Sequence, residues 1–290
     1  MIRIRQPKLS KLISVLSAII PLLVLVAIYR RATPTRLNIR DVDPRVRERF
    51  HDWKQCIEKE LTYLNDSDIL WLEFWKGIKL CETLPSMQQL VIGNFQNRDD
   101  TKRHIVSLQN TPSIVVSLGI GHDTAAEEAL QKVLPEGSQF YGADPMREVN
   151  EELYSKFGTF LPFAVGAKSG ITSAKVLINN EYVERSVIQI ELIYLLTEII
   201  GHKVYDNLWI DTEGAEYDLF SYFFRDGKLD QHGITICQFN MEVTFGQEEP
   251  TIQDFGKSYD VYCNLLISES GNKTSNALMA KSACWERKIS

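Results

Sequence analysis

The sequence has few of the residues that cross-link a chain or bind metals. Its 290 residues include five cysteines and five histidines, with no C-x-x-C pair and no histidines at metal-ligand spacing. We therefore expect no catalytic metal and no disulfide-dense fold. The odd number of cysteines leaves at least one thiol without an intrachain partner, and does not decide whether the compartment is oxidising. A content of 44% hydrophobic and 24% charged residues excludes a disordered or collagen-like chain.

Positive charge is scarce outside the N-terminus. Residues 1–31 carry six Lys/Arg and no acid, whereas the remaining 259 residues have 26 Lys/Arg against 38 Asp/Glu, a net charge of −12. Proteins that bind nucleic acids present an excess of basic residues to the phosphate backbone. The acidic body therefore predicts that no nucleic acid is a partner.

The longest run without a charge covers residues 12–29, which is at the short end of what spans a bilayer as a helix. Basic residues flank it on both sides, which argues against a buried core helix. Its exit, Ile28-Tyr29-Arg30-Arg31, has bulky and charged residues where a signal-peptide cleavage site needs small ones. We expect a basic tail at 1–11 and a transmembrane signal-anchor at 12–29, so that the membrane is a partner.

The orientation of this anchor is nearly balanced, because four basic residues precede the run and five follow it within about 15 residues. Acceptor sequons at Asn65 and Asn272 would suit a lumenal body. We expect a single-pass membrane protein of the secretory pathway (ER/Golgi) with a lumenal catalytic domain.

The rest of the chain divides into three parts. Residues 30–45 contain Pro34 and Pro44 and predict a linker. Residues 46–110 predict a helical N-terminal extension, because apolar residues such as Phe50, Trp53 and Ile57 recur at spacings of three and four as far as about residue 92. Residues 111–290 form the main predicted domain.

Short apolar runs alternate with helical patterns in this domain. The pattern predicts strands at 113–118, 138–143, 160–167, 174–178, 208–210 and 234–243, and helices at 124–133, 146–156, 186–200 and 215–224. Thr124 and Glu127 predict a capping box on the first of these helices. Residues 259–268 and 283–289 are strand candidates for an edge hairpin. The alternation predicts an α/β fold with a mostly parallel sheet and helices on both faces.

The first candidate site is Gly119-Ile120-Gly121, which follows the strand predicted at 113–118. Glycines allow a ligand to approach the backbone closely, although a tight turn without function explains them nearly as well. Asp144 ends the next strand, 25 residues after Gly119, where an acid hydrogen-bonds a nucleotide ribose. Asp144 would also cap the helix that follows Pro145. Together the turn and the acid predict an adenosine-containing ligand; a nicotinamide cofactor fits less well because Thr124 replaces the third glycine of G-x-G-x-x-G.

The second candidate site is a cluster of acids after the strand predicted at 208–210. Asp211, Glu213 and Glu216 place three carboxylates within six residues. Such crowding is unfavourable through desolvation and repulsion unless a cation or a proton transfer uses the acids. Glu216 would also favour the first turn of the following helix.

These segments resemble the FkbM family of S-adenosylmethionine-dependent O-methyltransferases, over residues 113–243. The most specific match is W-I-D-T-E-G-A-E at 209–216, which is similar to the family's I-D-x-E-G-A-E signature. Y-G-A-D-P at 141–145 resembles the family's acidic-Pro step, and A-V-G at 164–166 resembles its third-strand segment. The resemblance implies a Rossmann-like class I methyltransferase sheet with an antiparallel strand near the C-terminus. It also implies S-adenosyl-L-methionine as the cofactor and methyl transfer to a hydroxyl of a glycan or small molecule.

The resemblance also assigns roles to residues. The cofactor-binding residues it implies are Ser117, Gly119, Gly121, Asp144, Ala164 and Asp211. An alcohol is a poor nucleophile at neutral pH, so we expect Asp211 or Glu213 as the catalytic base, with His122 as a further candidate. Ser117 stands where such enzymes often have an acid, and this favours the alternative of a degenerate, membrane-tethered binding or scaffold protein.

Overall fold

The computed structural model describes residues 44–61, 67–106, 110–178, 181–223, 226–244, 263–269 and 274–281. The predicted tail and anchor, and the linker up to residue 43, lie outside these ranges. Among the described residues no helix has both the length and the apolar character needed to cross a membrane. The anchor at 12–29 therefore stays a prediction.

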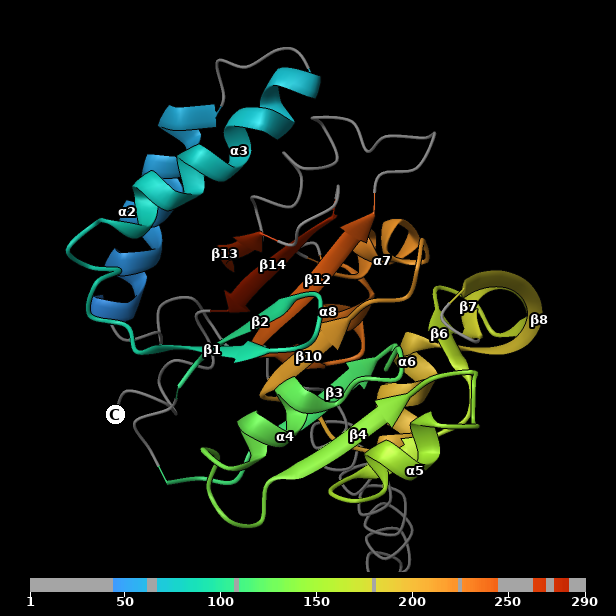
Figure 1. Cartoon of the computed structure of the whole chain (residues 1–290). Coiled ribbons are helices and arrows are strands. Elements are labelled where there is room, and N and C mark those ends of the chain that lie inside the picture. The colour runs from blue at the N-terminus through green and yellow to red at the C-terminus, as the bar shows by residue number, and fades with distance from the viewer. Residues whose placement is uncertain are drawn as a thin grey trace, which may run out of the picture. The chain divides into compact units, whose positions relative to one another are not determined.

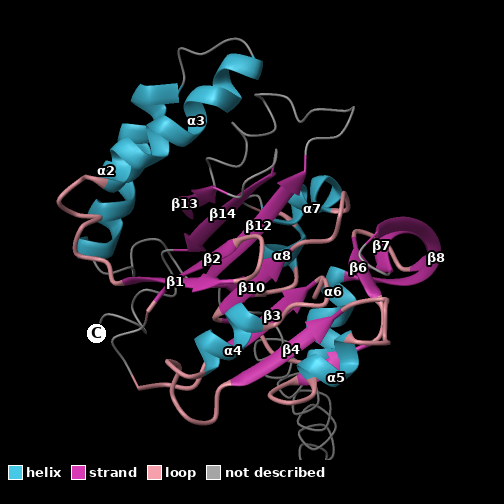
Figure 2. Ribbon diagram, in the orientation of Figure 1, coloured by secondary structure: helices cyan, strands magenta, loops and turns pink. Residues whose placement is uncertain are grey.

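A seven-stranded sheet forms the centre of the described chain (Figures 1 and 2). Its strand order is β13-β14-β12-β10-β3-β4-β5. Five strands run parallel: β3 (Ile114–Leu118), β4 (Gln139–Ala143), β5 (Thr159–Leu161), β10 (Asn207–Ile210) and β12 (Gln238–Thr244). β14 (Thr274–Lys281) is antiparallel to both β12 and β13 (Cys263–Glu269). This confirms the mostly parallel sheet and the antiparallel strand near the C-terminus, whereas the second strand of the predicted edge hairpin lies at 274–281 rather than at 283–289, which is outside the described residues.

Both faces of this sheet are covered, and this explains its continuously apolar strands. On one face α4 (Ala125–Gln131) and α5 (Asn150–Tyr154) pack with Val115 and Trp209. On the other face lie α6 (Leu192–Tyr194), a π-helical turn (Leu195–Ile200), α7 (Glu216–Phe223) and α8 (Lys228–Gln231), which pack with Val116 and Leu208. Successive strand residues thus serve opposite faces, as the pleat requires.

The N-terminal part of the described chain begins with the two helices that the spacing predicts, α2 (Pro44–Leu61) and α3 (Ser67–Glu82). A disulfide between Cys56 and Cys81 joins them. The prediction of a helical extension up to residue 110 is wrong beyond α3, because β1 (Ile92–Gln96) and β2 (Thr101–Ile105) form an antiparallel hairpin. The helix ends at Glu82, before the hairpin, and β2 packs on the sheet through side chains of β12.

A second hairpin corrects the helix predicted at 186–200. β7 (Gly170–Ile178) and β8 (Glu181–Glu191) are long antiparallel strands, and β6 (Ala164–Gly166) adds to β8 in parallel. The helix pattern holds only from residue 192 on, since Val176 and Val187 bury one face of the hairpin. Two predicted strands also divide. Residues 160–167 supply β5 and β6 to different sheets, and 234–243 supply β11 (Thr235–Ile236), which pairs with β9 (Val204–Tyr205), and β12.

Candidate functional site

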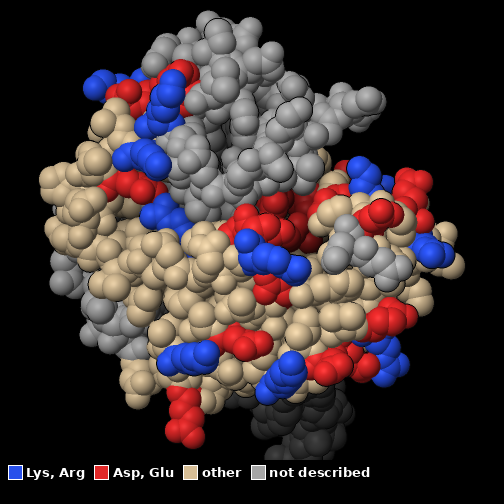
Figure 3. All heavy atoms as spheres, in the orientation of Figure 1, with Lys and Arg blue, Asp and Glu red and all other residues tan. Residues whose placement is uncertain are grey.

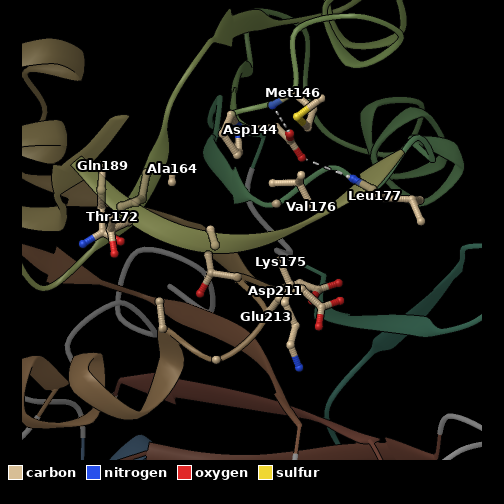
Figure 4. Close-up of a pocket in the computed structure, with 18 of the residues that line it drawn as sticks. Asp144, Met146, Ala164, Thr172, Lys175, Val176, Leu177, Gln189, Asp211 and Glu213 are labelled. Atoms are coloured by element: carbon tan, nitrogen blue, oxygen red, sulfur yellow. Dashed lines mark hydrogen bonds between the residues drawn. The ribbon is translucent and has the colours of Figure 1, made fainter. Parts of the chain in front are cut away.

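A pocket of about 410 Å³ lies where β3, β4 and β10 end (Figure 4). Residues lining it include most of those that the sequence singles out: Gly119, Gly121, His122, Asp144, Ala164, Asp211 and Glu213. The carboxyl ends of parallel strands meet at one edge, so residues as far apart in the chain as Gly119 and Glu213 converge there. Ser117 is the predicted site residue that does not line the pocket.

The two glycines of the turn are required for different physical reasons. Gly119 has a φ of +82°, and a Cβ built on it would overlap the carbonyl oxygen of Asp211 and lie 2.9 Å from its carbonyl carbon. Gly119 therefore permits the close approach of the chain after β10. Gly121 has a φ of +61°, but a Cβ there would meet nothing within 4 Å. A glycine at position 121 is therefore needed for the left-handed backbone conformation and not for a close contact, and the turn is open on the pocket side.

Asp144 organises this turn. Its Oδ2 accepts hydrogen bonds from the backbone N–H groups of Ile120 (2.9 Å) and Gly121 (3.4 Å), and its Oδ1 accepts one from Met146 N (2.7 Å). The bond to Met146 is the local capping role expected from the sequence. Asp144 is 7% exposed, and each carboxylate oxygen accepts more than one hydrogen bond, so the side chain retains acceptor capacity toward the pocket.

Ser117 lies beneath the turn in a buried polar network. Its Oγ donates to Glu127 Oε1 (2.8 Å), and Tyr154 Oη donates to Ser117 Oγ (3.3 Å). All three side chains are buried, and burial raises the pKa of Glu127 to about 7. Glu127 Oε2 accepts no hydrogen bond from the described residues. Related methyltransferases often have an acidic residue at the position of Ser117. Here Ser117 instead contacts the carboxylate of Glu127, which comes from α4.

The capping box predicted for α4 is wrong, because Glu127 points into this network and Thr124 makes no side-chain cap. Two other side chains take the first amides of the helix. Asp123 Oδ1 accepts from Ala125 N (3.0 Å), and Asn97 Oδ1, from the turn between β1 and β2, accepts from Ala126 N (2.9 Å). The β1–β2 hairpin therefore fixes the start of the helix that follows the glycine turn.

The turn after β10 is held by Glu216. Its carboxylate accepts hydrogen bonds from the backbone N–H and Oγ1 of Thr212 and from Gly214 N (2.6 Å). Glu213 adopts a φ of +54° within this turn. Glu216 thus has the structural role, while Asp211 and Glu213 line the pocket (Figure 4).

The electrostatics of Asp211 set it apart from an ordinary surface acid. Burial raises its pKa well above the usual range, the Lys102 ammonium lowers it, and the carboxylates of Glu242, Glu213 and Glu216 raise it further. A carboxyl group with a raised pKa holds a proton closer to neutral pH. Asp211 therefore has the property expected of a proton acceptor in a reaction at that pH.

The β7–β8 hairpin walls one side of the pocket and was not identified from the sequence. Lys175 and Glu184, which are cross-strand partners, line the pocket with Tyr182. Burial raises the pKa of the Tyr182 phenol, and the Glu213 carboxylate raises it further. Polar residues on a strand whose partner is unknown give no sequence signal of a site.

Lys102, on β2, is a second element that the sequence did not reveal. Its Nζ lies 2.6 Å from Asp100 Oδ2, and both side chains are nearly buried. The charged run Asp99-Asp100-Thr101-Lys102, with Arg98 before it and Arg103 after it, is a weak signal for such a pair. Among the residues that the structure describes, no group of three or more His, Cys, Asp or Glu side chains could hold a metal ion.

Acidic side chains predominate around the pocket. The charged residues lining it are Lys175 and five acids, namely Asp144, Glu184, Asp211, Glu213 and Asp218. Acidic side chains gather on this face of the molecule beside the β7–β8 hairpin (Figure 3). The pocket therefore favours a ligand with positive charge or with none.

The chain is similar to several known proteins. The chain is 22% identical over 196 residues to the uncharacterized protein C28H8.7 of Caenorhabditis elegans. The match covers 66% of this chain and 62% of that protein, so it spans less than two thirds of the relative. Among solved structures, the METTL16 methyltransferase domain matches with a TM-score of 0.36 at 10% identity, over 85% of this chain and 83% of that one. A SAM-dependent methyltransferase from Aquifex aeolicus matches with a TM-score of 0.29 at 9% identity, over 59% and 84%.

The family assignment rests on the domain profile. The profile of the methyltransferase FkbM domain matches residues 65–266, which is most of the chain and includes every residue of the pocket. The chain therefore belongs to the family of methyltransferases defined by the FkbM domain.

Proposed function

We propose that the chain is an S-adenosylmethionine-dependent methyltransferase that methylates a hydroxyl group of a glycan or small molecule. One observation carries this proposal: the glycine turn, Asp144 and the carboxylates of Asp211 and Glu213 line one pocket in a chain of the FkbM family. The glycine turn and Asp144 would bind the nucleoside of the cofactor, and the carboxylates of Asp211 and Glu213 would accept the proton of the acceptor hydroxyl.

The residues present fit this cofactor. Gly121 is open toward the pocket, and Gly119, Asp144 and Ala164 would complete the surface that holds the adenosine and methionine parts. The excess of carboxylates suits a ligand that carries a sulfonium and an ammonium group. When bound, S-adenosylmethionine supplies a methyl group on a leaving group that is already activated.

The chain's own part of the reaction is to orient the acceptor and take its proton. S-adenosylmethionine, held by Gly119, Gly121 and Asp144, would supply the methyl group to the acceptor oxygen and would keep the electron pair of the broken bond on its sulfur. The hydroxyl proton passes to a carboxylate, for which Asp211 and Glu213 are the candidates. The raised pKa of Asp211 supports it as acceptor, because a carboxylate with a raised pKa is a stronger base than an ordinary one. Tyr182 and Glu213 line the same pocket, and the Glu213 carboxylate raises the pKa of the Tyr182 phenol.

The charges of the pocket support an uncharged acceptor. Five acids face one lysine among the charged residues that line it, so a phosphate or carboxylate on the acceptor would meet like charge. A neutral sugar or another alcohol carries no such penalty. We expect neutral polyhydroxyl compounds to be methylated at least tenfold more efficiently than their phosphorylated or uronate counterparts, measured as kcat/KM with labelled S-adenosylmethionine.

Cofactor binding is the first test. The full-length chain is titrated with S-adenosylmethionine by calorimetry, beside Asp144→Ala and, as a matched control, Glu136→Ala, which changes an exposed acid outside the pocket. We expect micromolar binding by the parent chain and the control, and none by Asp144→Ala, because the glycine turn loses its acceptor. Absence of binding by the folded parent chain would overturn the proposal and favour the scaffold alternative.

The catalytic assignment has its own variants. Asp211→Asn and Glu213→Gln keep the size of the side chains but remove the base. We expect cofactor affinity to persist and methyl transfer to fall about a hundredfold or more in at least one of them. Unchanged turnover in both variants would remove the assignment of the base.

We also propose that the chain is a single-pass membrane protein of the secretory pathway with the catalytic domain in the lumen. The disulfide between Cys56 and Cys81 supports this, as does the disulfide-bonded state of Cys237, because disulfides persist in oxidising compartments. In cells, endoglycosidase treatment should change the mobility of the full-length chain unless both Asn65→Gln and Asn272→Gln are introduced. A chain that never acquires a glycan and keeps Cys56 reduced would contradict this.

A further inference from the structure

We propose that Lys102, on β2, is a positioning residue of the active site that favours the ionised form of the Asp211 side chain. The inference rests on the proposed function only in giving Asp211 the role of proton acceptor. No motif of the sequence links the two residues, which are 109 positions apart.

Side-chain amides of β12 fix the register of β2 on the sheet, because they hydrogen-bond to the β2 backbone as a neighbouring strand would. Gln238 Oε1 accepts from Ile105 N (2.8 Å). Two residues earlier on β2, Arg103 N donates to Asn240 Oδ1 of β12 (3.1 Å). Asn240 Nδ2 donates in turn to Arg103 O (2.8 Å). Each step back along β2 thus corresponds to a step forward along β12, and Lys102 is level with Met241.

This register brings Lys102 to the end of β10. Met241 pairs with Ile210 of β10 in the parallel ladder, and Asp211 follows Ile210. Lys102 and His104 are the alternate residues of β2 that face the sheet, since both are buried. His104 Nδ1 lies 2.9 Å from Asn207 Nδ2 at the start of β10, so Lys102, two residues along, extends toward the other end of that strand.

Several carboxylates interact with the single ammonium group of Lys102. The Lys102 and Asp100 side chains are 7% and 6% exposed, with 2.6 Å between Nζ and Oδ2. Asp211 and Glu242 also attract the Lys102 ammonium, and Glu127 of α4 interacts with it from the other side. A buried ammonium that faces several carboxylates stabilises the ionised form of each one.

The groups that face Asp211 explain why it needs such a partner. Glu242 of β12, Glu213 of the turn and Glu216 of α7 raise its pKa, as does burial, whereas Lys102 lowers it. The Tyr182 phenol of β8 also faces it. Removal of Lys102 would therefore raise the pKa of Asp211 further and leave less of the carboxylate form that can accept a proton from an alcohol.

A purely structural role for Lys102, as the partner of Asp100 in the turn of the hairpin, makes a different prediction. Loss of the pair would then lower stability but leave the titration of Asp211 unchanged. Measurement of that titration separates the two roles, and it does not require an acceptor or turnover.

The experiment follows the Asp211 carboxyl carbon by NMR in the full-length, ¹³C-aspartate-labelled chain, with Asp211→Asn to assign the signal. The variants are Lys102→Met, Lys102→Arg, and Lys132→Met as the control, since Lys132 is exposed at the end of α4. We expect Lys102→Met to weaken the acidity of Asp211 at least tenfold, and both Lys102→Arg and Lys132→Met to leave it near the parent value.

A second variant covers the case in which Lys102→Met does not fold. Asp100→Asn removes a competing negative charge and leaves Lys102 in place, so it should strengthen the acidity of Asp211, an effect that general disruption would not produce. In a methyltransferase assay the acidic limb of the kcat–pH profile should move in the same directions. An unchanged Asp211 titration in folded Lys102→Met, or in Asp100→Asn, would overturn the proposal, whereas absence of methyl transfer with the expected titrations would overturn only the proposed function.

Discussion

Substitution of Gly119 by alanine tests the close approach at the centre of the site. A Cβ at this position would overlap the carbonyl oxygen of Asp211, so the end of β10 would have to move away from β3. This movement would strain the hydrogen bond between Asp211 N and Leu118 O, which is 2.8 Å long and continues the β3–β10 ladder. Gly121 offers a matched control, because it shares the left-handed conformation but has no atom within 4 Å of the added carbon.

The magnitudes follow from this difference. A left-handed alanine costs about 1 to 2 kcal/mol at either position. At Gly119 the steric overlap adds about 1 to 3 kcal/mol, and the weakened ladder bond about 1 kcal/mol more. We therefore expect Gly119→Ala to lower the free energy of unfolding by about 3 to 6 kcal/mol, and Gly121→Ala by about 1 to 2 kcal/mol.

Urea denaturation of the parent chain and both variants measures these differences, and thermal unfolding gives a second readout. At about 2 to 4 °C per kcal/mol, Gly119→Ala should lower the Tm by roughly 6 to 24 °C, and Gly121→Ala by roughly 2 to 8 °C. Cofactor titration should show lost binding in Gly119→Ala, because the floor of the pocket moves. Equal effects of the two substitutions on stability would refute the claim that close approach, rather than conformation alone, requires a glycine at Gly119.

Three further predictions concern the surroundings of the site. Cys56→Ser with Cys81→Ser should lower the free energy of unfolding by about 3.5 kcal/mol, since the disulfide closes a loop of 25 residues; a loss below about 1 kcal/mol would contradict the entropic reasoning. Burial raises the pKa of Glu127 from 4.5 to about 7, so the folded chain binds more protons between these values and this contribution to stability falls as the pH rises. Across that window, the stability of the parent chain relative to Glu127→Gln should fall by about 3 kcal/mol in urea titrations, and parallel pH profiles would exclude it. Asn97→Ala should cost about 1 kcal/mol in urea denaturation, because Ala126 N loses its cap, and Asn97→Ser should recover part of this; equal values for the two variants would argue against capping.

Local patterns were sufficient for most of the central sheet. Each parallel strand is a short apolar run bounded by polar or glycine residues, so the runs at 113–118, 138–143 and 208–210 predict β3, β4 and β10 to within a residue or two at each end. The helix predicted at 186–200 failed in its first half because residues 183, 187 and 190 are apolar at spacings that fit a helix as well as a strand. Only pairing with β7 decides between the two, and pairing is a long-range property.

The same limit applies to the interactions of single side chains. Thr124 and Glu127 have the spacing of a capping box, but a buried partner for Glu127 on β3, Ser117, outweighs the local bond. Asn97 caps α4 from 29 residues away, and Lys102 reaches the sheet through a register that Gln238 and Asn240 define. These contacts join residues distant in sequence, so no local pattern encodes them.

The sequence by itself determined the elements that carry the cofactor site, because their glycines and acids have local reasons to occur at strand ends: a left-handed turn, a cap and the start of a helix. The tertiary structure decided which of these residues share a pocket, that Ser117 lies beneath it, that the β7–β8 hairpin walls it, and that the charge of Lys102 acts on Asp211. The physical reason is that strand order, hairpin register and burial set distances and charges between residues far apart in the chain. The acidity of Asp211 is a property of that assembled neighbourhood rather than of the motif in which the residue stands.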